Sequence, residues 1–132
     1  MALVNMPPAR SVQANRMVLE PIDFFLGDGV TRATGLLVSD LQLDLSLNGT
    51  QLAWPLTSGA GIPDVRVAAG KVYWTEPSAG FYNIRFYPNV IGLWRVILAY
   101  PAEDQTVSFT YDVVPQAAGV GSIGIKTSFF RG

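Results

Sequence analysis

The sequence predicts an all-β protein, and three observations lead to that prediction. Apolar and polar residues alternate with a period of two over several stretches of the 132-residue chain. Many apolar residues in these stretches are β-branched or aromatic, the types that pleated strands favour. Glycines and prolines separate the stretches as turn formers, and no stretch follows the helical period of 3.6 residues. A chain of this length corresponds to one domain, with room for an appendage.

Residues 1 to about 35 differ in composition from the rest of the chain. Their apolar content is too high for a disordered tail, and Pro21 would break a helix. One interpretation makes residues 20–26 the first strand of the core, preceded by a frayed start. The other makes residues 1–27 an extended N-terminal arm that docks on a neighbouring subunit. The two interpretations are about equally supported, and we adopt the arm as the domain division.

The middle of the chain contains several predicted strands. A half-buried strand is indicated by four leucines that alternate with polar residues: Leu41, Leu43, Leu45 and Leu47. The pair Asn48-Gly49 is a strong signal for a two-residue hairpin turn, so residues 50–54 are expected to return beside that strand. Residues 57–63 are expected to form a loop, followed by short strands at 65–67 and 71–75.

Residues 80–100 carry the clearest strand pattern in the sequence. Each of two predicted strands has three apolar residues on one face. These are Tyr82, Ile84 and Phe86 in the first strand, and Trp94, Val96 and Leu98 in the second. Between them, Pro88 cannot donate a ladder hydrogen bond and Gly92 permits a positive φ. We therefore predict a β-hairpin whose buried face the remaining chain covers.

Residues 106–114 form the last clear predicted strand, which Pro115 ends. Residues 116–132 are expected to be a glycine-rich linker with a C-terminal tail or strand. About seven short antiparallel strands joined by frequent turns predict an immunoglobulin-like β-sandwich over residues 28–115. Its expected core consists of Leu41, Leu43, Leu45, Tyr82, Ile84, Phe86, Trp94, Val96, Leu98, Phe109 and Tyr111.

Composition and charge argue against several classes of function. Charged residues make up 14% of the chain, the net charge is −1, and the basic residues form no run, so nucleic-acid binding is not expected. The chain contains no histidine and no cysteine, which removes the commonest metal ligand, the commonest general base and any thiolate. We expect no enzymatic activity, no cofactor and no metal site.

The sequence also gives an expectation for location. The N-terminus lacks the charged start and the apolar run of a signal peptide. No stretch approaches the roughly 20 apolar residues of a membrane span. We therefore expect synthesis in the cytoplasm and no membrane partner.

The aromatic residues admit two interpretations. Trp54 and Trp74, with Glu76 nearby, would suit a carbohydrate-binding or carbohydrate-cleaving module if they were exposed. Packing in a sandwich core is the simpler interpretation, and aromatic residues that such a core cannot accommodate would contact another chain. The expected interface residues are Val12, Met17, Phe24, Phe25, Phe81, Tyr87, Phe129 and Phe130.

Several motifs between residues 28 and 115 resemble a known group of proteins. They are Asp-Gly-Val-Thr-Arg-Ala-Thr-Gly-Leu at 28–36, Gly-Phe-Tyr-Asn-Ile-Arg-Phe at 80–86, Gly-Leu-Trp-Arg-Val-Ile at 92–97 and Tyr-Asp-Val-Val-Pro at 111–115. In this order they resemble the small immunoglobulin-like domains of structural proteins from tailed bacteriophages. In that group a Gly-x-Tyr strand precedes a glycine-containing turn and a second strand.

The resemblance implies a non-enzymatic structural subunit of a virion. Within that class, size and low charge favour a capsid decoration (cement) protein that stabilises the particle through subunit contacts. The alternative is a tail, baseplate or fibre component, with a carbohydrate-binding module as a further variant. The implied partners are other virion proteins, either the major capsid protein or tail proteins, together with further copies of this chain. A trimer is the first expectation for the homo-oligomer.

Overall fold

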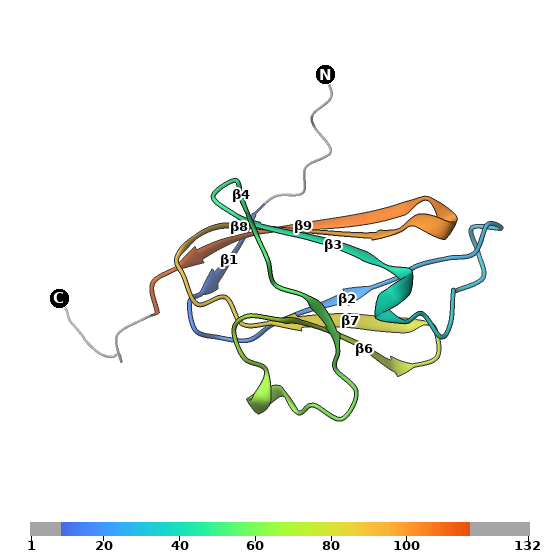
Figure 1. Ribbon diagram of the computed structural model, residues 1–132, viewed down its shortest axis with the longest axis horizontal. Coiled ribbons are helices and arrows are strands. Elements are labelled where there is room, and N and C mark those ends of the chain that lie inside the picture. The colour runs from blue at the N-terminus through green and yellow to red at the C-terminus, as the bar shows by residue number, and fades with distance from the viewer. Residues whose placement is uncertain (1–8, 117–132) are drawn as a thin grey trace, which may run out of the picture.

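The computed structural model describes residues 9–116, and these residues form two β-sheets packed face to face (Figure 1). The nine strands are β1 (Arg10–Gln13), β2 (Val18–Ile22), β3 (Gln42–Leu47), β4 (Thr50–Leu52), β5 (Leu56–Ser58), β6 (Val72–Ser78), β7 (Phe81–Phe86), β8 (Gly92–Tyr100) and β9 (Gln105–Val114). One sheet has the order β1-β9-β8-β3-β4 and the other the order β2-β7-β6-β5. The prediction of an all-β, sandwich-like fold is therefore confirmed.

The sheets are mixed, which corrects the expectation of purely antiparallel strands. Most neighbouring strands are antiparallel, but β1 runs parallel to β9, with Arg10 opposite Tyr111. Strand β5 also runs parallel to β6, with Leu56 opposite Val72. Parallel neighbours cannot be joined by a tight turn and need a longer connection between them. Each parallel pair lies at the edge of its sheet, so the pairs add short strands to an antiparallel centre.

The core lies between the two sheets and is rich in aromatic rings. Every residue of the expected core is either buried or packed against the buried cluster. The largest fully buried side chains include Trp94, Tyr111, Phe24 and Phe86. Phe86 contacts both Trp94 and Tyr111, with ring centroids 6.2 and 5.4 Å apart. The period-two pattern therefore identified the inward faces of the strands correctly.

The predicted hairpin over residues 80–100 is wrong as a pairing. Strand β7 lies between β2 and β6 in one sheet, whereas β8 lies between β9 and β3 in the other. The intervening residues 87–91 cross between the two layers (Figure 1). Both strands bury the expected face, but from opposite sides of the core. The crossing is fixed to the start of β8, since the Trp94 indole donates to the carbonyl of Val90 at 2.8 Å.

Two turn predictions have different outcomes. The Asn48-Gly49 hairpin is confirmed, because Leu47 pairs with Thr50 and both turn residues have positive φ, 51° and 85°. These angles fit the turn type that matches the twist of paired strands. By contrast, the prediction of a short strand at residues 65–67 is wrong. Residues Asp64–Arg66 form a 3₁₀ helix, η2, which begins directly after Pro63.

The prediction of an N-terminal arm over residues 1–27 is wrong for the part of that range that the structure describes. Strand β2 pairs with β7 along its whole length, with Val18 opposite Phe86 and Ile22 opposite Tyr82. Phe24, expected at an interface, is completely buried in the core of its own chain. The physical reason is that β7 offers an open edge and the core a space for these apolar side chains. Residues 1–8 lie outside the described part of the chain, as do residues 117–132.

Candidate functional site

Phe25, Arg32 and Phe81 come together at one end of the sandwich, and we call them the aromatic–arginine cluster. Phe25 follows β2 and forms an isolated antiparallel bridge with Arg32. Phe81 is the first residue of β7. The Arg32 guanidinium carbon lies 3.9 Å from the centre of the Phe81 ring and 5.5 Å from that of Phe25. Both distances are within the range of a cation–π interaction.

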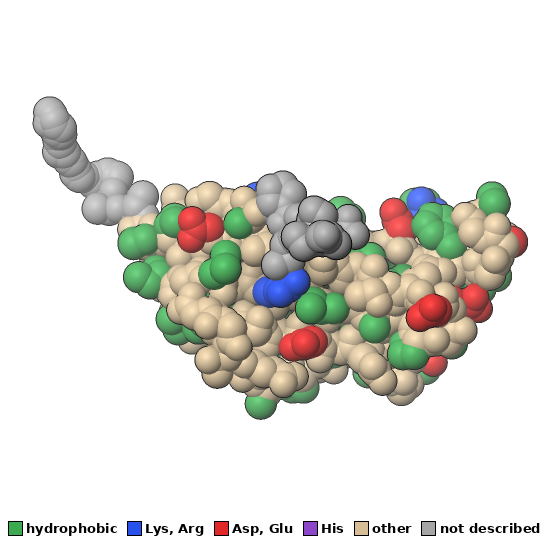
Figure 2. Space-filling view, turned by 90° about the horizontal axis from the view of Figure 1, so that it is seen from above, with side chains coloured by type: hydrophobic (Ala, Val, Ile, Leu, Met, Phe, Trp, Pro, Cys, Tyr) green, Lys and Arg blue, Asp and Glu red, His purple; other side chains and the backbone are tan. Residues whose placement is uncertain are grey.

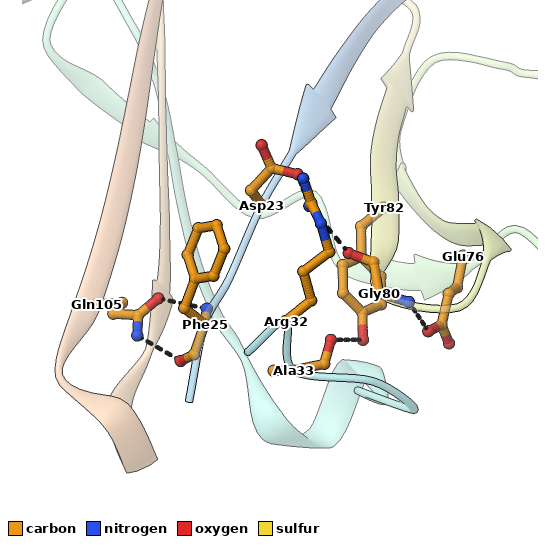
Figure 3. Close-up of polar contacts among 8 residues, drawn as sticks. All are labelled: Asp23, Phe25, Arg32, Ala33, Glu76, Gly80, Tyr82 and Gln105. Atoms are coloured by element: carbon orange, nitrogen blue, oxygen red, sulfur yellow. Dashed lines mark hydrogen bonds and ion pairs between the residues drawn. The ribbon is translucent and has the colours of Figure 1, made fainter. Parts of the chain in front are cut away.

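Arg32 is held in this position by polar contacts on its other side. Its Nη1 forms an ion pair with a carboxylate oxygen of Asp23, and it also donates to the Gly80 carbonyl at 3.4 Å (Figure 3). The guanidinium is therefore neutralised by a neighbour while it contacts the Phe81 ring. Phe81 nevertheless remains 48% exposed. An ordered, half-exposed aromatic ring beside an arginine is typical of the central residues of protein interfaces.

The backbone beneath the cluster is tied to both sheets (Figure 3). The Phe25 N–H donates to Oε1 of Gln105 at 3.0 Å, and Nε2 of Gln105 donates to the Phe25 carbonyl. On the other side, the Tyr82 hydroxyl donates to the Ala33 carbonyl at 2.8 Å. Gln105 belongs to β9 and Tyr82 to β7, so the two ends of this segment are fixed by strands of different sheets. The cluster is thus supported by ordered backbone.

A tight turn next to the cluster presents two further apolar side chains. The Asp28 carboxylate accepts hydrogen bonds from the backbone N–H groups of Val30 and Thr31 at 2.9 and 2.8 Å, and from the Thr31 hydroxyl at 2.6 Å. These hydrogen bonds lower the pKa of Asp28, with the Thr31 hydroxyl as the largest cause and the two backbone N–H groups as the next. This turn leaves Val30 79% exposed and Leu26 40% exposed. Together with Phe81 they give this end of the molecule an apolar surface.

The same end is surrounded by acidic groups. Glu76 accepts from the N–H of Gly80 at 2.8 Å and from the N–H of Gly35 at 3.2 Å, and the Gly80 bond is the main cause of its lowered pKa. Asp23 and Asp28 lie in the cluster and in its turn. The η3 turn (Pro101–Glu103) adds Glu103, whose carboxylate lies against Gly27, and the adjacent Asp104. Figure 2 shows acidic side chains gathered at this end, to the right.

A second apolar surface lies at the opposite end of the sandwich. Val90, Ile91 and Leu93 are each about half exposed and belong to the crossing between β7 and β8 or to the start of β8. Leu93 is fixed by Asn48, whose side-chain oxygen accepts from the Leu93 N–H and whose backbone N–H donates to the Leu93 carbonyl, both at 2.8 Å. This surface was not predicted, although an apolar run inside a turn was its signal in the sequence.

A groove of about 550 Å³ lies on the outer face of the β2–β7–β6 sheet. Arg85 lies beneath it and is almost fully buried, although alternation placed it on a solvent-facing strand surface. Its guanidinium donates to the carbonyls of Ile62 and Gly59 at 2.7 and 3.0 Å and to Asp64 at 2.9 Å. These bonds hold the 59–64 loop over the sheet. Arg85 therefore has a structural role in attaching that loop.

The two tryptophans considered for sugar stacking contribute to the interior. Trp74 is buried and stacks on Tyr82, with ring centroids 4.6 Å apart and an interplanar angle of 15°. Trp54 is partly buried and meets Trp94 edge to face at 5.2 Å. Trp74 and Glu76 do line a common pocket of about 620 Å³, beside the 3₁₀ helix η1 (Val38–Asp40). The structure thus brings together two of the three residues named for that alternative.

The predicted interface residues divide into four groups. Phe25 and Phe81 meet in the aromatic–arginine cluster. Val12 packs against the core from β1, and Phe24 is buried. Met17 and Tyr87 are half-buried and flank the Val18–Phe86 pair, at the other end of β7. Phe129 and Phe130 lie outside the described residues.

Within residues 9–116, no group of three or more acidic side chains is placed to hold a metal ion. No helix in that part of the chain is long and apolar enough to cross a membrane. Comparisons with protein-family models, with curated proteins and with solved structures found no match.

Proposed function

We propose that the chain is a non-enzymatic structural subunit of a bacteriophage virion, and specifically a capsid decoration (cement) protein. The observation that carries this proposal is the aromatic–arginine cluster, an ordered and exposed aromatic surface on a small sandwich. Interfaces are enriched in aromatic residues and arginine at their centres, and this cluster supplies both within one contact region. The partners would be other virion proteins and further copies of this chain.

The strand order supports the finer assignment of an immunoglobulin-like sandwich. If β2 is taken as the second strand of such a domain, β2-β7-β6 corresponds to the order B-E-D and β9-β8-β3 to G-F-C. Strand β4 then extends the second sheet beside β3, as an added C′ strand would. Strand β5 departs from the pattern, since it pairs with β6 in the opposite sheet. This assignment is consistent with the phage structural domains that the sequence motifs resemble.

The direct test is to locate the protein in a purified particle by cryo-EM. Density for the sandwich on the outer shell supports a decoration protein, and density at the tail or baseplate supports the alternative structural role. Particles assembled with Phe81→Ser should carry fewer copies than particles assembled with Val65→Ser. Val65 is 92% exposed on η2 and lies outside the cluster, so it is the matched control. A cellular, non-viral location would refute the proposal.

A carbohydrate-binding role is the second candidate because Trp74 and Glu76 line one pocket. A glycan array probed with the purified chain tests it directly. The matched variant is Ala60→Trp, which places a bulky side chain at the wall of that pocket without changing Trp74. Glycan binding that is lost in this variant favours the carbohydrate role, and absence of binding by the unmodified chain argues against it.

A further inference from the structure

We propose that the aromatic–arginine cluster is the docking site for residues 117–132 of a second copy of this chain, so that copies associate head to tail. The proposal deepens the homo-oligomeric part of the proposed function, on which it rests. It can be tested on the purified protein in the absence of virion particles. Three features support it: the place where β9 ends, the charge around the cluster and the apolar character of its surface.

The first feature is the direction of β9. This strand begins at Gln105, which is bonded to Phe25 beside the cluster, and ends at Val114 at the other end of the sandwich. Ten strand residues span about 30 Å. Residues 117–132, fully extended, reach at most about 55 Å. To reach the cluster of its own chain, the segment would have to reverse and run back along the sandwich. A neighbour aligned head to tail presents its cluster directly beyond β9.

The second feature is charge complementarity. Residues 117–132 contain Lys126 and Arg131 and no acidic residue. The cluster end carries the opposite sign, because Arg32 is outnumbered by Asp23, Asp28, Glu76, Glu103 and Asp104. Complementary potentials accelerate encounter and disfavour wrong partners. A basic segment is therefore the occupant that suits this surface electrostatically.

The third feature is the match between apolar groups. The segment contains Phe129 and Phe130 next to Arg131. The cluster end offers the half-exposed Phe81 ring and the exposed side chains of Leu26 and Val30. An aromatic pair in offset or edge-to-face contact adds to the free energy of burial alone. Phe129 and Phe130 would thus cover an apolar surface that the described part of the chain leaves open.

A head-to-tail contact uses two different surfaces, so it forms a ring if the rotation closes and a filament if it does not. This property gives a complementation test by size-exclusion chromatography with light scattering. The unmodified chain should form oligomers larger than a dimer. Phe81→Ser and the double variant Phe129→Ser/Phe130→Ser should each associate about tenfold or more weakly, because each lacks one half of the contact. Their equimolar mixture should stop at a dimer, since one intact contact remains.

Controls separate loss of docking from loss of folding. Val30→Ser, which removes an exposed side chain of the same surface, should weaken association without changing the circular dichroism spectrum. Val65→Ser should leave the oligomer unchanged. Raising NaCl from about 0.05 to 0.5 M should reduce the oligomer mass, as screening predicts. A monomeric unmodified chain with no dimer in the mixture would overturn the proposal. Oligomers that persist in Phe81→Ser and Val30→Ser would overturn it too.

Failure of this test and failure of the virion proposal are distinguishable. The complementation experiment uses purified chains alone, whereas cryo-EM locates the protein in a particle. A decoration protein that is monomeric in solution would retain the first proposal and refute only the head-to-tail contact.

Discussion

The hydroxyl of Tyr111 donates a hydrogen bond of 2.6 Å to Oε2 of Glu20, and this bond joins the two sheets through the core. Tyr111 belongs to β9 and Glu20 to β2, which lie in opposite sheets. The same carboxylate oxygen forms an ion pair with Nη2 of Arg10 at 2.8 Å. Glu20 is 7% exposed, so its carboxylate depends on these partners for the hydrogen bonds that water would otherwise supply.

Replacing Tyr111 with Phe should destabilise the protein by about 1–3 kcal/mol, the range for leaving a buried polar group without its partner. The ring would still fill the core, so a cavity is not expected. Urea denaturation followed by tryptophan fluorescence measures the change. As a control, Arg10→Met removes the other partner at a more exposed position and should cost less. Equal stability of Tyr111→Phe and the unmodified protein would contradict the prediction.

The pKa of Glu76 gives a prediction about acid stability. Its pKa lies below the ordinary value of 4.5, chiefly because the carboxylate accepts from the Gly80 N–H. A group whose pKa is lowered by folding stabilises the native state above its unfolded pKa and loses that contribution as pH falls through the folded value. Glu76→Gln should therefore be less stable than the unmodified protein at neutral pH, and the gap should close below about pH 4.5.

Thermal melts between pH 7 and pH 3 measure that gap. Asp44→Asn, on β3, removes one carboxylate without touching the Gly35 and Gly80 N–H groups, and so controls for the change in net charge. A gap between Glu76→Gln and the unmodified protein that stays constant across the whole range would argue against a role for the charged form of Glu76.

Gly80 and Gly29 form a matched pair for testing the close approach between the backbone at Gly80 and the Arg32 side chain. Both have positive φ, 79° and 73°. A Cβ on Gly29 would meet nothing within 4 Å, whereas a Cβ on Gly80 would lie 2.8 Å from Cβ of Arg32. Gly29→Ala should cost about 1–2 kcal/mol, the penalty for a left-handed conformation. Gly80→Ala should cost clearly more by urea denaturation, and equal costs would show that the contact with Arg32 relaxes freely.

Arg85→Met should release the 59–64 loop without unfolding the sandwich. The variant removes donors to Gly59, Ile62 and Asp64, and each hydrogen bond to a charged group contributes about 1.5–3 kcal/mol. Limited proteolysis with trypsin is a suitable measurement, since Arg66 lies in η2 directly after this loop. Cleavage after Arg66 should become about tenfold faster or more. Arg16→Met, at an exposed position between β1 and β2, should leave that rate unchanged.

The inward faces could be predicted from the sequence because alternation is a local property. Tyr82, Ile84, Phe86 and Trp94 are buried as their spacing indicated. Strand pairing is not local, and the same spacing cannot distinguish a hairpin from a crossing between sheets. For that reason the spacing predicts one hairpin where β7 and β8 lie in different sheets. The parallel pairing in the mixed sheets could likewise not be predicted from the sequence, since the partner of β1 lies about a hundred residues away along the chain.

One residue made strand β2 difficult to recognise in the sequence. Val18 and Ile22 face the core, and Glu20 faces it between them. A carboxylate at an inward position breaks the apolar alternation, and it is explained by the partners that the fold supplies, Tyr111 and Arg10. The candidate site shows the same limit. Phe25 and Phe81 were predicted as interface residues, but Arg32, which joins them, carries no signal until the fold brings the three together.

The parallel pairing of β1 with β9 determines how the sandwich would respond to mechanical tension. The two strands run in the same direction, with Arg10 to Gln13 opposite Tyr111 to Val114. A pull applied before β1 and after β9 therefore draws the strands past each other along their length. In that geometry the ladder hydrogen bonds share the load and break together, whereas a hairpin pulled from its open end loses them one at a time. A subunit tethered at both ends would thus resist force at β1 and β9 before the core is loaded.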